Sequence, residues 1–103
     1  MQVSDIPVEH HFADKLYTKT MRLGAGQVIG KHVHAFSHLS ILGSGRASVT
    51  TPAGTVEYSA PACITIEANV EHVIHALTPI AWFCIHATDE TDPAKIDETL
   101  IDD

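Results

Sequence analysis

Histidine is the residue type in this sequence that could support chemistry. Eight of the 103 residues are histidine, and five of these lie between positions 32 and 75. His32, His34 and His38 share the same parity, so an extended chain directs the first two to one face and allows the third to face the same interior. His72 begins a later β-like run just after a turn. Because imidazole binds zinc, copper, iron and nickel, whereas calcium and magnesium prefer oxygen ligands, these four residues predict a transition-metal site.

Short β-like runs separated by turn residues make up most of the chain. They recur about every ten residues and are rich in Val, Ile and Thr, which is typical of a β-sandwich or barrel. Only residues 93–101 look helical, with Asp92 as the N-cap and Pro93 at the first helical position. We expect one all-β domain at 16–87, preceded by an N-terminal segment at 1–15 and followed by an acidic, partly helical tail at 88–103. The expected strands are 16–23, 27–34, 38–42, 46–51, 55–59, 63–67, 72–77 and 80–87.

The spacing around the first three histidines is found in a known family. The sequence GQVIGKHVHAFSHLSILGSG places five residues between Gly26 and His32, three between His34 and His38, and six between His38 and Gly45. This resembles the first motif of the cupin superfamily, and in particular of its small single-domain metal-binding members. The chain departs from the motif at His38, where the family usually has glutamate, although some cupins place a fourth histidine there.

The second cupin motif is degenerate in this chain. Glu67 and Asn69 stand where the family has proline and glycine, Ala76 replaces the closing asparagine, and Pro61 replaces the opening glycine. Asparagine is a tolerable substitute for glycine because it enters the left-handed backbone region more readily than most residues. His72 fits as the histidine of this motif by its position after the turn and its distance from the first motif.

The resemblance implies a jelly-roll barrel, the double-stranded β-helix, with one divalent transition metal per chain. His32, His34, His38 and His72 would be the ligands. Iron or manganese is the favoured metal, and nickel, copper and zinc remain alternatives. Cupins commonly dimerise, and a small open barrel has sheet edges to cover, so a homodimer is expected.

Four histidines on a six-coordinate metal would leave two adjacent positions for a substrate and dioxygen. Phe36 shares the parity of the first histidines, and Leu42, Ile74 and Trp82 would extend an apolar wall of a small-molecule pocket. One hypothesis is therefore a dioxygenase-type oxidoreductase acting on a small organic molecule. The alternative is a non-catalytic accessory or sensor protein, of the kind found in phage genomes, in which four imidazoles enclose zinc. Sugar isomerase or epimerase activity is a weaker alternative.

The remaining histidines and cysteines are harder to place. His10 and His11 lie in a polar segment and are expected to be solvated, while His75 is out of step with the neighbouring ligand and should point away from the interior. Cys84 and His86 share one face of the last strand, and the sequence leaves open which face that is. A buried thiol that packs as a small apolar group is the more common role of such a cysteine.

Charge and composition exclude some classes of function. Residues 89–103 contain seven acidic residues and only Lys95, which gives −6 of the total charge of −7 and leaves about −1 for the body. Nucleic acids and anionic membranes require clustered Lys and Arg, so neither is an expected partner. Two cysteines are too few for a disulfide framework, and no signal peptide or membrane span is apparent, so we expect a cytoplasmic protein.

Overall fold

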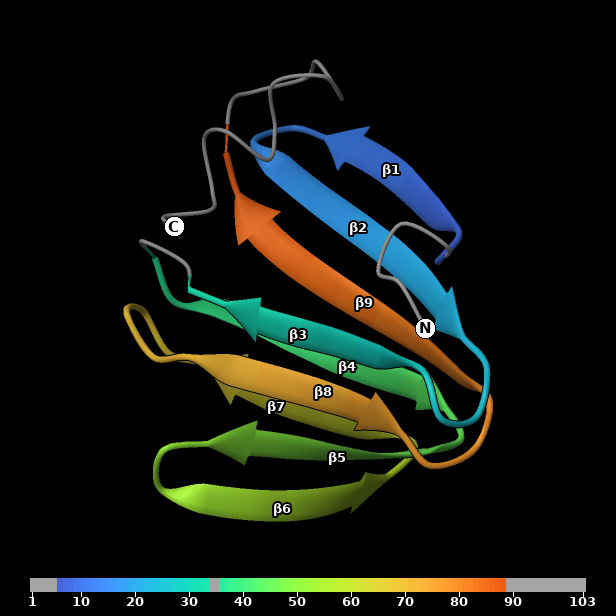
Figure 1. Cartoon of the computed structure of the whole chain (residues 1–103). Coiled ribbons are helices and arrows are strands. Elements are labelled where there is room, and N and C mark those ends of the chain that lie inside the picture. Colours follow the sequence, from blue (N-terminus) through green and yellow to red (C-terminus); the bar gives the residue numbers. More distant parts are fainter. Residues whose placement is uncertain (1–5, 34–35, 89–103) are drawn as a thin grey trace.

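Two antiparallel β-sheets face each other in the computed structural model of the chain (Figure 1). The structure describes residues 6–33 and 36–88, and for residues 31 and 32 it describes the backbone. Within these residues there are nine strands and no helix. The described part of the chain therefore contains no membrane-spanning helix. The predicted all-β class is confirmed, while the helix predicted at 93–101 lies outside the described residues.

Strands that are distant in sequence lie side by side in both sheets. One sheet has the order β1 (Val8–Ala13), β2 (Leu16–Leu23), β9 (Ile80–Ala87), β4 (His38–Ser44) and β7 (Ala62–Ile66). The other has the order β3 (Val28–His32), β8 (His72–Ala76), β5 (Arg46–Thr51) and β6 (Gly54–Ser59). All eight expected strands are present, with ends within two residues of the predicted ones.

One strand, β1, is not predicted by the sequence pattern. β1 lies in the predicted N-terminal segment and pairs with β2 along its whole length, from Val8 opposite Met21 to Ala13 opposite Leu16. Its sequence, VEHHFA, has little apolar alternation, because β1 is an edge strand whose residues are mostly exposed or half-buried. An edge strand needs less apolar surface than a central strand, so its pattern is weaker.

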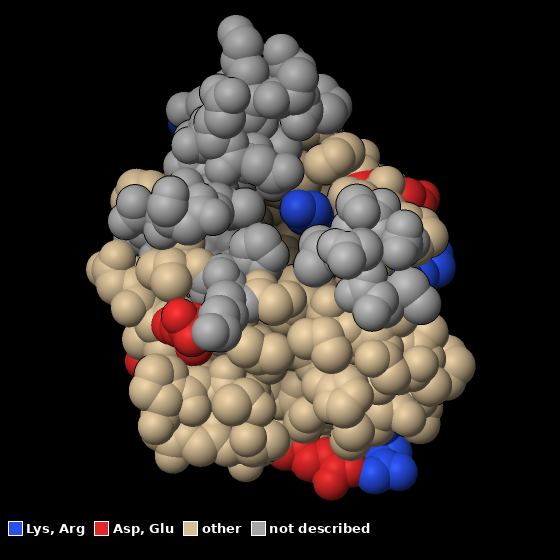
Figure 2. Space-filling model, viewed as in Figure 1, with Lys and Arg blue, Asp and Glu red and all other residues tan. Residues whose placement is uncertain are grey.

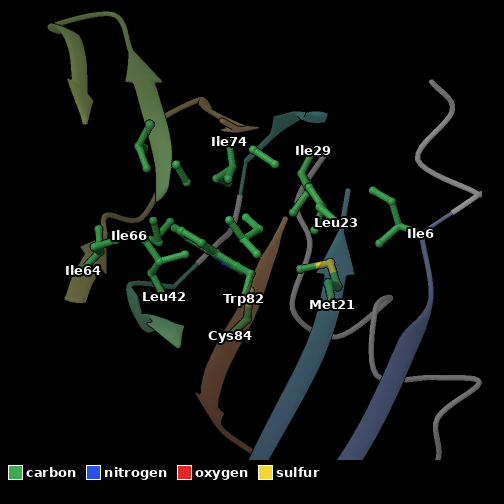
Figure 3. Packing of buried hydrophobic residues seen from close by; sticks show 14 residues of the cluster. Ile6, Met21, Leu23, Ile29, Leu42, Ile64, Ile66, Ile74, Trp82 and Cys84 are labelled. Carbon is green, nitrogen blue, oxygen red and sulfur yellow. The ribbon is translucent and has the colours of Figure 1, made fainter. Parts of the chain in front are cut away.

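Apolar side chains from both sheets point into the space between them (Figure 3). Trp82 and Leu42 pair across β9 and β4 and are almost completely buried, with 1% and 0% of their surface exposed. Burial of such large apolar side chains is the main favourable contribution to folding. The cluster comprises Ile6, Met21, Leu23, Ile29, Leu42, Ala47, Val49, Ile64, Ile66, Ile74, Ala76, Ile80, Trp82 and Cys84.

The interior changes character along the strands. The inward-facing residues of three strands run from a histidine at one end to an apolar residue toward the other. These residues are His38, Ser40 and Leu42 in β4, His86, Cys84 and Trp82 in β9, and His72, Ile74 and Ala76 in β8. The two sheets therefore enclose an apolar core at one end and buried imidazoles at the other, which we call the histidine end.

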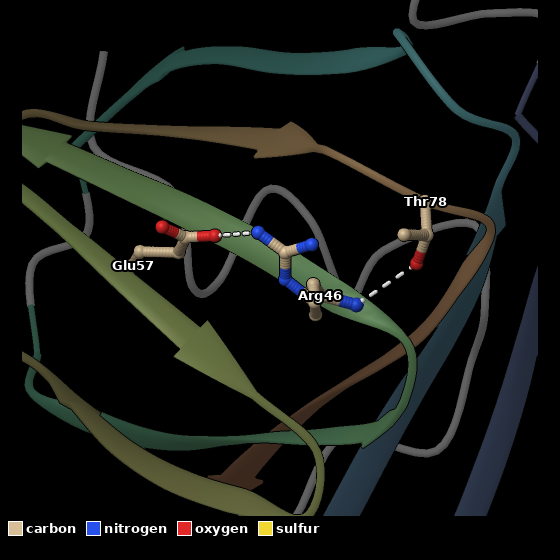
Figure 4. Close-up of polar contacts among 3 residues, drawn as sticks. All are labelled: Arg46, Glu57 and Thr78. Atoms are coloured by element: carbon tan, nitrogen blue, oxygen red, sulfur yellow. Dashed lines mark hydrogen bonds and ion pairs between the residues drawn. The ribbon is translucent and has the colours of Figure 1, made fainter.

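Charged side chains on the surface pair across neighbouring strands. Arg46 forms an ion pair with Glu57 across β5 and β6, and its backbone N–H donates to the Thr78 hydroxyl at 2.9 Å (Figure 4). In Figure 2, acidic and basic atoms lie side by side at the lower edge of the molecule, where Figure 1 places β6. An exposed pair of this kind contributes at most about 1 kcal/mol, so it helps to align the strands rather than to hold the fold together.

Replacing Gly45 by alanine should destabilise the fold. Gly45 has a φ of 81°, and an added Cβ would lie 2.2 Å from the Pro79 carbonyl oxygen, so both the backbone conformation and the space exclude a side chain. We expect Gly45→Ala to lower the free energy of unfolding by about 2 kcal/mol or more in urea denaturation. The control is Gly30→Ala, where an added Cβ meets nothing within 4 Å. Equal stability of the two variants would contradict the assignment.

Candidate metal centre

Two of the predicted ligands are buried at the first residues of strands in opposite sheets. His38 begins β4 and is 7% exposed, and His72 begins β8 and is 6% exposed. The chain brings these starts to the same end, because Ile66 of β7 pairs with His38 and only five residues separate Ile66 from His72. The Ala68 N–H donates to the Ser37 hydroxyl oxygen at 3.0 Å, which ties this connection to the residue before His38.

Both rings are oriented by backbone carbonyls. Nδ1 of His72 lies 2.6 Å from the Val70 carbonyl oxygen, and Nδ1 of His38 lies 3.2 Å from the Leu39 carbonyl oxygen. A carbonyl can only accept, so Nδ1 carries the proton in each ring, and in the neutral ring Nε2 carries the lone pair. The Nε2 atom of His38 is itself buried. Metal-binding histidines characteristically have this arrangement, in which one nitrogen donates to an oxygen and the other faces the ion.

The loop that supplies the Val70 carbonyl depends on Asn69. This residue has a φ of 61°, in the left-handed region that favours glycine. Asn69 therefore adopts the left-handed conformation that the sequence analysis expected of a residue standing in for glycine. The left-handed turn directs the chain so that the Val70 carbonyl lies beside the His72 ring.

The structure brings His32 next to His72 but leaves the ligand set incomplete. His32, at the end of β3, is the backbone partner of His72, after an irregularity in pairing that begins at Ile29. The His32 side chain and the whole of His34 lie outside the described part of the structure. Among the described side chains, no group of three or more His, Cys, Asp or Glu is placed to hold a metal ion. Of the four predicted ligands, only His38 and His72 have side chains within the described part of the structure.

An open groove of about 770 Å³ reaches His72 at the histidine end. Three separate parts of the chain form it: the end of β3, the turn between β5 and β6, and the loop between β7 and β8. Glu67 and Glu71 are exposed and give the groove negative charge. A small molecule could therefore reach His72 from solvent. The lining residues are Val33, Thr51, Pro52, Ala53, Thr65, Glu67, Asn69, Val70, Glu71 and His72.

The residues predicted to line a substrate pocket do not border this groove, and their role in a pocket stays a prediction. Leu42, Ile74 and Trp82 belong to the buried apolar core, and Phe36 is 63% exposed. None of the four lines the groove. For Phe36 the prediction assumed that strand parity continues past the first histidines, but β3 ends at residue 32 and the next strand begins at residue 38, so parity does not carry across the connection.

The comparisons with known proteins concern the fold. No family model matches the sequence, and no curated protein matches it. A cupin superfamily protein from Desulfitobacterium hafniense superimposes with a TM-score of 0.73 at 13% identity, over 82% of this chain and 78% of that one. An RmlC-like cupin with a double-stranded β-helix from Methanocaldococcus jannaschii gives 0.71 at 18% identity, over 89% and 85%. The chain has the cupin fold.

A larger enzyme also contains a region of this shape. The salicylate 1,2-dioxygenase of Pseudaminobacter salicylatoxidans superimposes on 91% of this chain with a TM-score of 0.74 at 16% identity. The match covers 28% of the dioxygenase chain. At this level of identity the similarity establishes a shared fold.

His86 is a buried residue of the site that sequence reasoning left unassigned. It is 6% exposed, and its ring centroid lies 4.1 Å from that of His38. Its face could have been predicted, because His86 has the same strand parity as Trp82, which was expected to point inward. His75 is exposed, as predicted. His10 is half-buried rather than simply solvated, and its Nδ1 lies 2.6 Å from the hydroxyl oxygen of Tyr17.

Cys84 separates the histidine end from the apolar core in β9. Burial raises the pKa of its thiol above the ordinary value, and a hydrogen bond from the Ser40 hydroxyl, at 3.7 Å, only partly offsets this effect. Ser40 and Cys84 are also direct partners across β4 and β9. The second cysteine, Cys63, is exposed.

The two thiols should differ sharply in reactivity. With an aromatic disulfide reagent, the native protein should react at one thiol per chain, that of Cys63, and the unfolded protein at two. Raising the pH from about 7 to about 9 should not bring Cys84 into the reaction, because its raised pKa keeps the proton on the buried sulfur. The Cys63→Ser variant is the control and should show no native reaction. Rapid native labelling of that variant would show that Cys84 is accessible.

Proposed function

We propose that this cupin binds one divalent transition metal between its two sheets through His32, His34, His38 and His72. We further propose that it uses the metal as a dioxygenase-type oxidoreductase acting on a small organic molecule. One observation carries the proposal. Two buried imidazoles from opposite sheets both donate through Nδ1 to a backbone carbonyl, which leaves Nε2 as the coordinating nitrogen in each.

The chemistry of the donor set fits a first-row transition metal. Imidazole nitrogens suit iron, nickel, copper and zinc, whereas calcium and magnesium would need oxygen ligands. No Asp or Glu is buried among the described residues, so no carboxylate there competes for the role of ligand. A bound iron or manganese would supply Lewis-acid and redox chemistry that none of these side chains can supply alone.

The protein's own residues control access to the site. The groove reaches His72 directly, and its exposed carboxylates, Glu67 and Glu71, repel anions. We therefore propose that the substrate enters as a molecule without negative charge. The shared fold with salicylate 1,2-dioxygenase supports the class of reaction, while the acidic groove argues against a negatively charged acid as the substrate.

A second candidate function is a metal-binding module without turnover. It is favoured by the lack of any buried Asp or Glu among the described residues, because such a group is a common general acid or base. In this case the imidazoles would hold zinc in a closed tetrahedral site, and the protein would serve as an accessory or sensor protein.

Removing either described ligand should abolish tight metal binding. We expect His38→Ala and His72→Ala to lower metal content from about one ion per chain to a small fraction, because each loses a coordinating nitrogen. Elemental analysis after dialysis against a weak chelator measures this. His75→Ala is the matched control, since His75 lies on the same strand as His72 but is exposed. A full complement of metal in both ligand variants would overturn the proposed site.

Turnover distinguishes the two candidate functions. The protein loaded with iron(II) or manganese(II) should consume oxygen with at least one of four uncharged or weakly acidic substrate types: diketones, flavonols, thiols or alkenyl phenols. The zinc-loaded protein should consume none, because zinc has no redox chemistry. Oxygen uptake is followed with an electrode, and His72→Ala serves as the inactive control. No uptake with any redox metal would favour the binding module.

A further inference from the structure

Ring contacts extend across four neighbouring strands of the larger sheet. The ring of His38 in β4 contacts His86 in β9, with centroids 4.1 Å apart and planes inclined by 40°. His86 stacks on Tyr17 of β2 at 6.0 Å and 23°, and Tyr17 contacts Phe12 of β1 at 5.1 Å. We call His38, His86, Tyr17 and Phe12 the ring row.

Strand register accounts for the ring row. Phe12 pairs with Tyr17 across β1 and β2, and Tyr17 pairs with His86 across β2 and β9. Leu39 pairs with Ile85, so His38 and His86 lie one residue beyond that pair. Figure 1 shows β1, β2 and β9 side by side in this order. Side chains directly opposite one another on the same face are close enough to contact, so the pairing itself aligns the rings.

The middle of the ring row is closely packed. Tyr17 is 1% exposed and His86 is 6% exposed, and the Tyr17 hydroxyl oxygen lies 2.6 Å from Nδ1 of His10. His86 thus lies between a ring that is held in place and the ring of His38. In a close-packed interior, a flat ring confined on both sides has little freedom to turn.

The ring of His38 is held less closely by its backbone carbonyl than the ring of His72 is. The contact from His38 Nδ1 to its carbonyl is 3.2 Å, near the long limit for such a hydrogen bond, whereas that of His72 is 2.6 Å. A long hydrogen bond restrains ring orientation weakly. The ring of His86, with its centroid 4.1 Å away, adds a restraint on the angle of the His38 ring.

We propose that His86 is a positioning residue for the metal centre. Its ring, supported by Tyr17, holds the His38 imidazole at the angle at which Nε2 binds the ion. This inference rests on the proposed metal site. We assign His86 to positioning because its ring lies against that of His38, with centroids 4.1 Å apart, and the variants below distinguish this role from coordination.

Cobalt(II) titration of His86 variants tests this role, with the visible absorption bands reporting coordination geometry. His86→Phe keeps a flat ring and should bind cobalt(II) within about threefold of the wild-type affinity, with the same spectrum. His86→Ala removes the ring and should weaken binding about 10–100-fold, with altered bands, the range typical of residues that orient a ligand. His75→Ala is the control, and urea denaturation confirms that each variant is folded.

Each result decides the question. If His86→Phe binds as weakly as His86→Ala, His86 is itself a ligand and the inference is wrong. If His86→Ala binds like the wild type, His86 has no role at the site. Should His86→Ala fail to fold, His86→Leu fills the space without a flat ring and should show the same loss. Retention of cobalt(II) by His38→Ala and His72→Ala would instead overturn the metal site itself.

Discussion

The burial of imidazole rings between two sheets is the constraint on which the rest of the structure depends. His38, His72 and His86 are each at most 7% exposed. A buried polar group without a hydrogen-bond partner costs about 1–3 kcal/mol, so the fold must provide acceptors where the rings lie. It does so for two of them with the carbonyls of Leu39 and Val70, which lie within two residues of the ring that they accept from. Local chain geometry at the histidine end is therefore set by the rings.

The two ends of the interior differ in the side chains that they bury. The apolar end contains the almost fully buried Trp82 and Leu42 and supplies most of the hydrophobic burial, while at the histidine end His72 borders the groove. Ser40 and Cys84 lie between them as a small, weakly polar layer. Since the same strands carry all of these layers, the rigid core fixes the positions from which the imidazoles project, which favours a precise site.

The positions of strands could be predicted best from the sequence for strands that are central in a sheet and alternate between polar and apolar residues. β2, β5 and β9 were predicted with their observed ends because their flanking turns contain Gly, Pro or Thr. The prediction failed for β1, whose edge position leaves VEHHFA without a clear apolar face. Parity predicted the inward direction of His38, and position after a turn singled out His72, but parity could not place Phe36, because the connection between β3 and β4 interrupts the alternation.

Contacts between side chains on different strands could not be predicted from the pattern of residue types along the chain. Parity put His86 on one face of its strand, but only the pairing of β9 with both β2 and β4 brings it against Tyr17 and His38. The Ser37 contact to Ala68 likewise joins segments 31 residues apart. Such contacts follow from sheet order, which a single sequence with local periodicity does not specify.

The charge balance of the proposed site narrows the chemistry that it favours. Four neutral imidazoles would leave the double positive charge of a bound ion intact, and no buried carboxylate among the described residues offsets it. In an interior of low dielectric, such a charge strongly favours a ligand that can lose a proton. Glu67 and Glu71 in the groove meanwhile disfavour molecules that arrive as anions. At the proposed site the two effects together would favour molecules that carry no negative charge but have an acidic proton, such as diketones, phenols and thiols.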